Sequence, residues 1–317
     1  MGTFAQCASV LSFVMAPMLV SLAGAQGQFS QAGAQAIINT KDWNRLLAYG
    51  KAWAQSEPNN ADAWFVIGRA YGSKFYHIGL ERPAGALPAF QKVVQLRPEW
   101  PDGWNALGAI EQELNQWIDA VVAFQHAVRL APTRTQYWRL LSASYIHTHQ
   151  FPQAAEATAN LENYAKSAQD WFDAGQLYYG IGQYYQPTLM YQKSKGYFQR
   201  FLKLEPKNGP GWTNLGTTEE VLGNYQAALD DYKKGAQLGN ALGGTNYRSL
   251  TTALQTCQNW KQSVLKNPGP ARPLSIPVIT YNPQTGQNER HGGRQPTYAE
   301  IYNSHCARLT GALPVPK

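Results

Sequence analysis

Apolar side chains recur along most of the chain at the three- and four-residue spacings that define one face of an amphipathic helix. The stretch "WNALGAIEQELNQWIDAVVAFQHAVRLAP" shows this pattern twice. Its first half puts Trp104 and Gly108 on one face, and its second half does the same with Ala120 and Phe124. Because glycine has no side chain, a second helix can approach closely at Gly108. The pattern predicts two short helices packed face to face.

The phrase that begins this stretch occurs five times, mostly at a spacing of about 34 residues. Its copies are Trp64-Ile67-Gly68, Trp104-Leu107-Gly108, Trp138-Leu141-Ser142, Trp171-Ala174-Gly175 and Trp212-Leu215-Gly216. An aromatic residue precedes each second segment: Trp43, Trp117, Phe151, Tyr225 and Trp260. Prolines 58, 98, 132 and 206 are placed to end second helices. Neither helix of a copy can bury its apolar face alone, so we expect the copies to stack.

Some copies depart from the pattern. Residues 135–168 carry Ser142 in place of glycine and Thr158 where a ring is expected, and they lack the final proline. Insertions fall at residues 73–85 and 180–196, and the sequence leaves open whether they extend helices or form lids. We expect "KDWNRLLAYGKAWAQSEP" to be the second helix of a degenerate first copy, and "NYRSLTTALQTCQNWKQSVL" to be a truncated last copy.

The series Trp, Leu-Gly, Tyr, Ala, Phe, Ala and Pro resembles the consensus of the tetratricopeptide repeat (TPR). The resemblance covers about residues 29–265, so we assign residues 26–265 to about five to six repeats with degenerate ends. It implies an all-α fold, a right-handed superhelical solenoid of helix-turn-helix repeats, followed by a Pro-rich C-terminal extension. In this family the first helix of each repeat lines a concave groove that binds extended or helical peptides.

Carried onto this chain, the groove-facing positions include Phe65, Arg69, Asn105, Gln112, Arg139, Gln169, Phe172, Gln176, Thr213 and Thr217. Arg69 and Arg139, with Asn105 between them, would receive a carboxylate through charge-assisted hydrogen bonds. Phe65 and Phe172 would supply apolar anchors. The alternative, that many of these side chains are simply solvated, stays open. One TPR subtype clamps a C-terminal carboxylate with lysines and asparagines, but Phe65 and Asn105 replace its expected lysine here.

The first 25 residues have a different composition from the rest of the chain. They contain no charged side chain, carry an apolar stretch and end in Ala23-Gly24-Ala25, the small-x-small pattern that a signal peptidase cleaves. This predicts a signal peptide removed after Ala25 and a periplasmic or secreted protein, with an uncleaved anchor as the alternative. No later stretch has the roughly 18 successive apolar residues of a membrane-spanning helix.

Three cysteines are present, and Cys7 would leave with the signal peptide. Cys257 and Cys306 then remain as a pair in a compartment that permits disulfides. We predict a bond between them, and two buried free thiols are the alternative.

Residues 266–317 form a basic, Pro-rich tail. The net charge of the chain is +7, and the segment 261–317 carries seven basic residues against two acidic ones. Because no basic residues are adjacent, we expect a solvated tail, with peripheral association with anionic surfaces as an option, and no nucleic-acid binding. "IPVITYNPQTGQ" is expected to hold a short strand and a turn. "TYAEIYNSHCARL" is expected to be a short helix, begun by a capping box of Thr297 and Glu300, that caps the last repeat.

Residues that could carry chemistry are sparse. His147 and His149 fall at a helix end with no acidic or cysteine cluster, so a metal site is not expected. His305 and Cys306 are neighbours on a predicted helix and point in different directions. The glycines of "GIGQYYQ" lack the lysine of a phosphate-binding loop. We therefore expect no catalytic residue, no metal and no cofactor.

The function that these features favour is a non-enzymatic scaffold, which holds a protein or peptide partner in the groove in the periplasm or outside the cell. The alternative is a scaffold subunit of an envelope enzyme complex, of the polysaccharide-export or cytochrome-maturation type. Catalysis built from the insertions and the tail would need an acid, base or nucleophile cluster that the sequence does not show.

Overall fold

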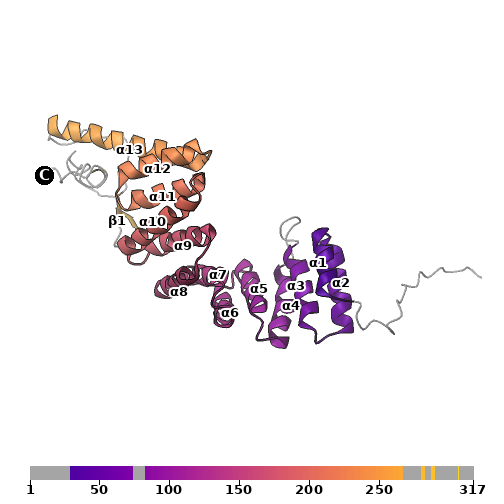
Figure 1. Cartoon of the computed structure of the whole chain (residues 1–317). Coiled ribbons are helices and arrows are strands. Elements are labelled where there is room, and N and C mark those ends of the chain that lie inside the picture. Colours follow the sequence, from indigo (N-terminus) through magenta and orange to yellow (C-terminus); the bar gives the residue numbers. More distant parts are fainter. Residues whose placement is uncertain (1–28, 74–82, 267–279, 283–286, 290–305, 307–317) are drawn as a thin grey trace, which may run out of the picture. The chain divides into compact units, whose positions relative to one another are not determined.

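The computed structural model describes residues 29–73, 83–266, 280–282, 287–289 and Cys306 (Figure 1). The predicted signal peptide, the centre of the first insertion and the predicted capping helix other than Cys306 lie outside these residues. The described residues contain thirteen α-helices and one two-stranded sheet. They divide into two compact units between Glu99 and Trp100, and each unit is described by itself. The all-helical repeat fold predicted from the sequence is confirmed.

Unit 1 contains four helices: α1 (Gln31–Asn39), α2 (Trp43–Ser56), α3 (Ala61–Ser73) and α4 (Pro83–Leu96). The side-chain oxygens of Ser30 and Asp42 accept the Gly33 and Arg45 backbone N–H at the starts of α1 and α2. Leu46 and Trp53 of α2 are buried in the core against Ile67 of α3. The predicted second helix of a degenerate first copy is therefore α2, and the short α1 is its partner.

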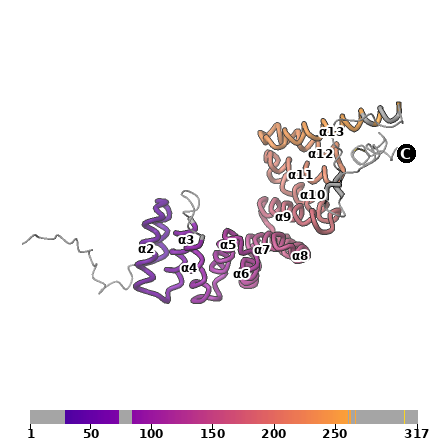
Figure 2. The backbone as a smooth tube through the Cα atoms, turned by 180° about the vertical axis from the view of Figure 1, so that it is seen from behind, coloured from indigo at the N-terminus to yellow at the C-terminus, as the bar shows by residue number. Residues whose placement is uncertain are grey.

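Unit 2 contains a succession of paired helices, which Figure 2 shows from behind. They are α5 (Pro101–Glu113), α6 (Trp117–Leu130), α7 (Thr135–His147), α8 (Phe151–Tyr164), α9 (Ala168–Gly182), α10 (Pro187–Leu204), α11 (Gly209–Val221), α12 (Tyr225–Gln237) and α13 (Ala241–Lys266). The strands β1 (Thr280–Asn282) and β2 (Gln287–Glu289) pair antiparallel, with Thr280 opposite Glu289. The second insertion lengthens α9 and α10 to 15 and 18 residues, so it extends helices.

Within most repeats, a ring of the second helix packs onto a glycine of the first. A Cβ atom built on Gly108 would lie 2.8 Å from the Phe124 ring, closer than real Cβ contacts allow. The other pairs are Gly68 with Phe90, Gly175 with Phe198 and Gly216 with Tyr232. Phe124, Phe198 and Tyr232 are at most 1% exposed. The missing side chain is thus what lets each helix pair close around its ring.

A hydrogen bond joins successive repeats at the prolines. In each case the indole N–H of the repeat's tryptophan donates to the carbonyl oxygen of the proline six residues earlier. The bonds join Trp64 to Pro58 at 2.8 Å, Trp138 to Pro132 at 2.7 Å and Trp212 to Pro206 at 2.9 Å. Trp171 follows the copy that lacks this proline, and its ring instead stacks on Tyr197 with the Arg200 guanidinium over it.

The irregular copy replaces the ring–glycine contact with a hydrogen-bonded pair. Ser142 and Thr158 are both fully buried, and their hydroxyl oxygens are 2.8 Å apart. Each hydroxyl also donates to the carbonyl oxygen of Ala154, at 3.0 and 2.8 Å. The two departures from the sequence pattern therefore compensate each other at one site.

The last copy ends differently from the others. Four earlier turns between the helices of a repeat use a residue with left-handed backbone two positions before the aromatic residue: Lys41, Asn115, His149 and Gly223. The equivalent position before Trp260 is Gln258, which lies within the continuous 26-residue helix α13. Trp260 therefore does not begin a second helix. Cys257 of α13 forms a disulfide with Cys306, with Cα atoms 5.1 Å apart.

We predict that Ser142→Gly and Thr158→Phe are coupled. Thr158→Phe alone should lower the free energy of unfolding by about 1–3 kcal/mol, because the ring would collide with the Ser142 side chain. Adding Ser142→Gly should recover at least about 1 kcal/mol, since it rebuilds the contact made in the neighbouring repeats. Urea unfolding of the wild type, both single variants and the double variant measures the coupling, and additive effects would contradict the compensation.

Candidate functional site

The first helices of the four repeats in unit 2 form one face. Helix α7 contacts α5 and α9, and α9 contacts α11. A pocket of about 260 Å³ opens on this face. It is lined by Gln176, Tyr179 and Gly180 of α9, Phe198 of α10, and Asn214 and Thr217 of α11. We call α5, α7, α9 and α11 the first-helix face, and this hollow the α9–α11 pocket.

Two predicted groove residues bridge neighbouring helices of this face. The Gln112 amide donates to the Ser144 hydroxyl at 2.8 Å, which joins α5 to α7. The Arg139 guanidinium lies 3.4 Å from the Asp173 carboxylate, which joins α7 to α9. Gln169 donates to the same carboxylate at 2.8 Å. The charge of Arg139 is therefore already compensated within the protein.

The predicted apolar anchors also pack within the protein. The Phe172 ring centroid lies 4.9 Å from that of Phe201 and 5.7 Å from that of Phe198. In unit 1, the Phe65 ring lies edge-on to Phe90 at 5.6 Å. Both phenylalanines are partly exposed, so each forms a wall of its helix pair.

Thr213 does not face a groove, contrary to the prediction. It is 2% exposed, and its hydroxyl donates to the Gly209 carbonyl oxygen and contacts the Asn240 side-chain oxygen, both at 3.1 Å. Gly235 and Gly243 cover it, because both have bare Cα atoms that let α12 and α13 approach the hydroxyl closely. The sequence pattern gives no sign of this contact, since it involves glycines of two later helices.

The remaining predicted positions differ in their surroundings. Gln176 and Thr217 line the α9–α11 pocket, as expected for groove residues. Asn105 is partly exposed, and its side-chain oxygen is buried without a hydrogen-bond partner among the described residues. Arg69 is exposed on α3 of unit 1, so the structure does not place it with Arg139 of unit 2.

The sequence did not point to Tyr179, Gly180, Phe198 or Asn214 as pocket residues. Tyr179 and Gly180 lie one helical turn beyond Gln176, and a strict 3.6-residue projection from Gln176 would have found Tyr179. Asn214 is the neighbour of the mispredicted Thr213. The pocket residues are thus shifted by one position on α11 relative to the expectation.

Acidic groups gather beside the α9–α11 pocket on α11 and α12. The Tyr232 hydroxyl donates to the Glu220 carboxylate at 2.6 Å and lies 3.3 Å from the Thr217 hydroxyl. Burial raises the pKa of Tyr179, and the charge of Glu220 adds to that effect. Burial, with the nearby charges of Glu219 and Asp230, also raises the pKa of Asp231 to about 7.

Glu111 and Glu219 occupy the same place in two repeats but differ in their partners. In each, the backbone oxygen accepts the N–H of the residue five positions later at 2.8 Å. The Glu219 carboxylate lies 2.7 Å from the Lys195 ammonium and accepts the Asn224 amide at 2.6 Å. Glu111 is 7% exposed, and its Oε2 has no partner among the described residues. Burial, and secondarily the charge of Asp119, raises the pKa of Glu111 to about 7.

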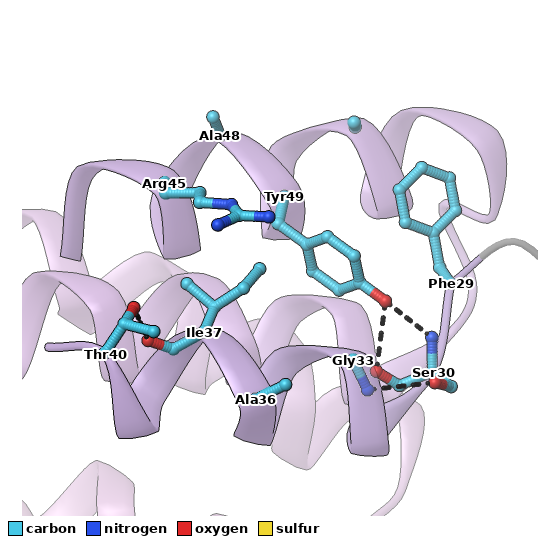
Figure 3. A pocket seen from close by; sticks show the side chains of 10 residues that line it. Phe29, Ser30, Gly33, Ala36, Ile37, Thr40, Arg45, Ala48 and Tyr49 are labelled. Carbon is cyan, nitrogen blue, oxygen red and sulfur yellow. Dashed lines mark hydrogen bonds between the residues drawn. The ribbon is translucent and has the colours of Figure 1, made fainter. Parts of the chain in front are cut away.

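Unit 1 carries a second hollow, of about 710 Å³, between α1 and α2 (Figure 3). The Tyr49 side chain crosses it, and the Tyr49 hydroxyl accepts the Ser30 N–H at 2.8 Å and donates to the Ser30 carbonyl at 3.2 Å. The Arg45 side chain lies beside Tyr49 over Ile37. These bonds fix the wall of the hollow, because they hold the start of α1 against α2.

The two histidines singled out in the sequence contact different rings. The His147 imidazole stacks on the Trp117 indole at 3.8 Å between centroids. His149 lies edge-on to Phe151 and Tyr184, which stack on each other at 5.0 Å. No group of three or more His, Cys, Asp or Glu residues suited to a metal ion occurs among the residues that the structure describes.

Comparison with known proteins supports the repeat fold. No family model matches the chain. "Tetratricopeptide repeat protein 37" of Xenopus laevis is 34% identical over 83 residues, which is 26% of this chain and 5% of that protein. The chain thus spans about a twentieth of the length of the curated relatives that it matches.

Two solved structures share the fold. The C-terminal part of a TPR repeat-containing protein from Cytophaga hutchinsonii has a TM-score of 0.55 at 14% identity, over 73% of this chain and 88% of that one. YrrB, described as a TPR protein with an unusual peptide-binding site, has a TM-score of 0.50 at 14% identity, over 63% and 97%. The described helices therefore have the tetratricopeptide-repeat fold. Among them, none is long and apolar enough to cross a membrane.

We predict that Glu111 makes stability fall as the pH rises. The folded carboxyl group binds its proton more tightly than the unfolded one, whose pKa is near 4.5. The free energy of unfolding should therefore decrease between about pH 4.5 and 7, by on the order of 3 kcal/mol. Glu111→Gln should remove this part of the slope in urea unfolding at pH 5 and pH 8. Glu156→Gln, on the exposed side of α8, should keep the wild-type slope, and equal slopes in all three proteins would contradict the assignment.

Proposed function

We propose that the protein is a non-enzymatic scaffold that binds a peptide segment of a partner protein on the first-helix face of unit 2. The observation that carries this proposal is the α9–α11 pocket, which lies between two successive first helices. YrrB, whose fold this chain shares, is described as having a peptide-binding site.

The chemistry of the pocket suits an extended peptide. Gln176 and Asn214 each present an amide that can both donate and accept hydrogen bonds, which matches the alternating N–H and C=O groups of a peptide backbone. Tyr179 and Phe198 provide ring surface for a side chain. The pocket is large enough for one partner side chain, so a binding peptide needs further contacts along the face.

The face is held in shape before any partner arrives. The Gln112–Ser144 and Arg139–Asp173 contacts tie three first helices together. A preorganised surface loses less conformational entropy on binding, which favours a scaffold that captures flexible segments. Arg139 therefore acts by positioning α7 and α9, in place of the carboxylate-binding role expected from the sequence.

We further propose that the protein is exported and works in the periplasm or outside the cell. The apolar first segment with its small-residue end supports export. The Cys257–Cys306 disulfide supports an oxidising compartment, because such bonds persist there. The basic tail would add weak attraction to anionic surfaces.

Peptide selection tests the binding proposal. Peptides selected from a random display library on the intact chain should lose at least about tenfold in affinity for Gln176→Trp, because the indole fills the α9–α11 pocket. Gln153→Trp, on the exposed face of α8, is the matched control and should bind like the wild type. Fluorescence anisotropy measures both. Selected peptides that bind Gln176→Trp undiminished would move the site elsewhere.

Protein purified from its native host tests the export proposal. The mature chain should begin at Gln26, and non-reducing peptide mapping should recover the peptides of Cys257 and Cys306 as one linked species. Replacing both cysteines with serine should lower the free energy of unfolding by about 3–4 kcal/mol, because the bond closes a loop of 49 residues. A chain that retains Met1 and two free thiols would refute export and the bond together.

A further inference from the structure

The α9–α11 pocket has walls without charge and one rim that is acidic. Its six lining residues are glutamine, tyrosine, glycine, phenylalanine, asparagine and threonine. Glu220 lies at the rim, because the Tyr232 hydroxyl that it accepts also contacts the pocket residue Thr217. Its charge also acts on the pocket residue Tyr179. The field inside the pocket is therefore negative.

The charge of Glu220 is not neutralised within the described helices. Its hydrogen-bond donor, Tyr232, is a neutral phenol. None of the ion pairs between the described residues includes Glu220. The cations nearest along the face have other partners, since Lys195 pairs with Glu219 and Arg139 with Asp173. Arg248 on α13 contacts the Thr245 hydroxyl of its own helix at 3.5 Å.

The surrounding charges add to this excess. Glu219, Glu220, Asp230 and Asp231 lie on α11 and α12, and Lys195 of α10 faces them. The mutual influence of Glu219, Asp230 and Asp231 shows that these carboxyl groups lie close together. A carboxylate ligand in the pocket would be repelled by this group, whereas a cation would be attracted.

We propose that the α9–α11 pocket binds a lysine or arginine side chain of the partner, with Glu220 as its counter-ion and the Tyr179 and Phe198 rings against its aliphatic stem. This rests on the proposed function, because it assigns the partner's chemistry at the same face. It replaces the carboxylate expected from Arg69 and Arg139. The chain itself uses the same pairing of cation and ring, with the Lys193 ammonium 4.7 Å from the Tyr178 ring centre.

Capped amino acids test this directly, without knowledge of the partner. The probes are the N-acetyl methylamides of lysine, arginine, glutamine and glutamate, titrated to 100 mM into the isotope-labelled intact chain. The readout is the NMR shift of the side-chain amides of Gln176 and Asn214. The lysine and arginine probes should bind at least about fivefold more tightly than the glutamine probe, and the glutamate probe most weakly.

Glu220→Gln should reduce this preference for cations to less than about twofold while leaving glutamine binding unchanged. The matched control Glu156→Gln makes the same substitution on the exposed side of α8, and it should keep the full preference. Raising the salt concentration should weaken the cationic probes alone, because the attraction is electrostatic and close to solvent.

Equal binding of the lysine and glutamine probes, tighter binding of glutamate, or no shift with any probe would overturn the inference. So would a cation preference that survives Glu220→Gln. The proposed function is judged separately by the peptide selection. Peptides that require an open pocket but lack a basic residue would leave the scaffold proposal standing and refute this one. A cation preference without any peptide that depends on the pocket would do the reverse.

Discussion

The contact between a ring of the second helix and a glycine of the first sets the geometry of each repeat. Gly108 and Phe124 show the constraint most simply, since no side chain fits between them. Once the two helices are fixed by this contact, the face of the first helix opposite the ring is left uncovered by its own partner. Successive repeats then line up these faces, held in register by the tryptophan–proline hydrogen bonds. The binding face is thus a consequence of the core packing.

The sequence predicts this framework well because its determinants are local. Trp138 and Pro132 lie six residues apart, and Gly108 and Phe124 lie within one helix pair, so a spacing of 34 residues exposes them all. Even the departure at Ser142 and Thr158 was visible as two separate irregularities. What the sequence could not show is that these residues meet, because their pairing depends on the depth to which the helices interlock.

The candidate site was predicted less well, and for a physical reason. Positions on the first-helix face belong to contacts between neighbouring repeats as well as to solvent, and the family pattern does not distinguish the two. Gln112 and Arg139 have partners on the next helix, and Thr213 is covered by Gly235 and Gly243. Only Gln176 and Thr217 line an open pocket. Exposure at such positions depends on side chains one repeat away, which a linear motif does not encode.

The same separation explains how one repeat pattern carries different electrostatics along its length. Glu111 and Glu219 occupy equivalent positions, yet Lys195 neutralises only Glu219, and Glu111 is buried without a cation. Neither difference disturbs the ring, the glycine or the tryptophan that build the repeat. Charges can therefore be redistributed without altering the fold, and a chain whose net charge is +7 can still present a negative pocket. Because the basic excess lies in residues 261–317, a basic partner is repelled least at α9 to α12, where the acidic side chains are concentrated.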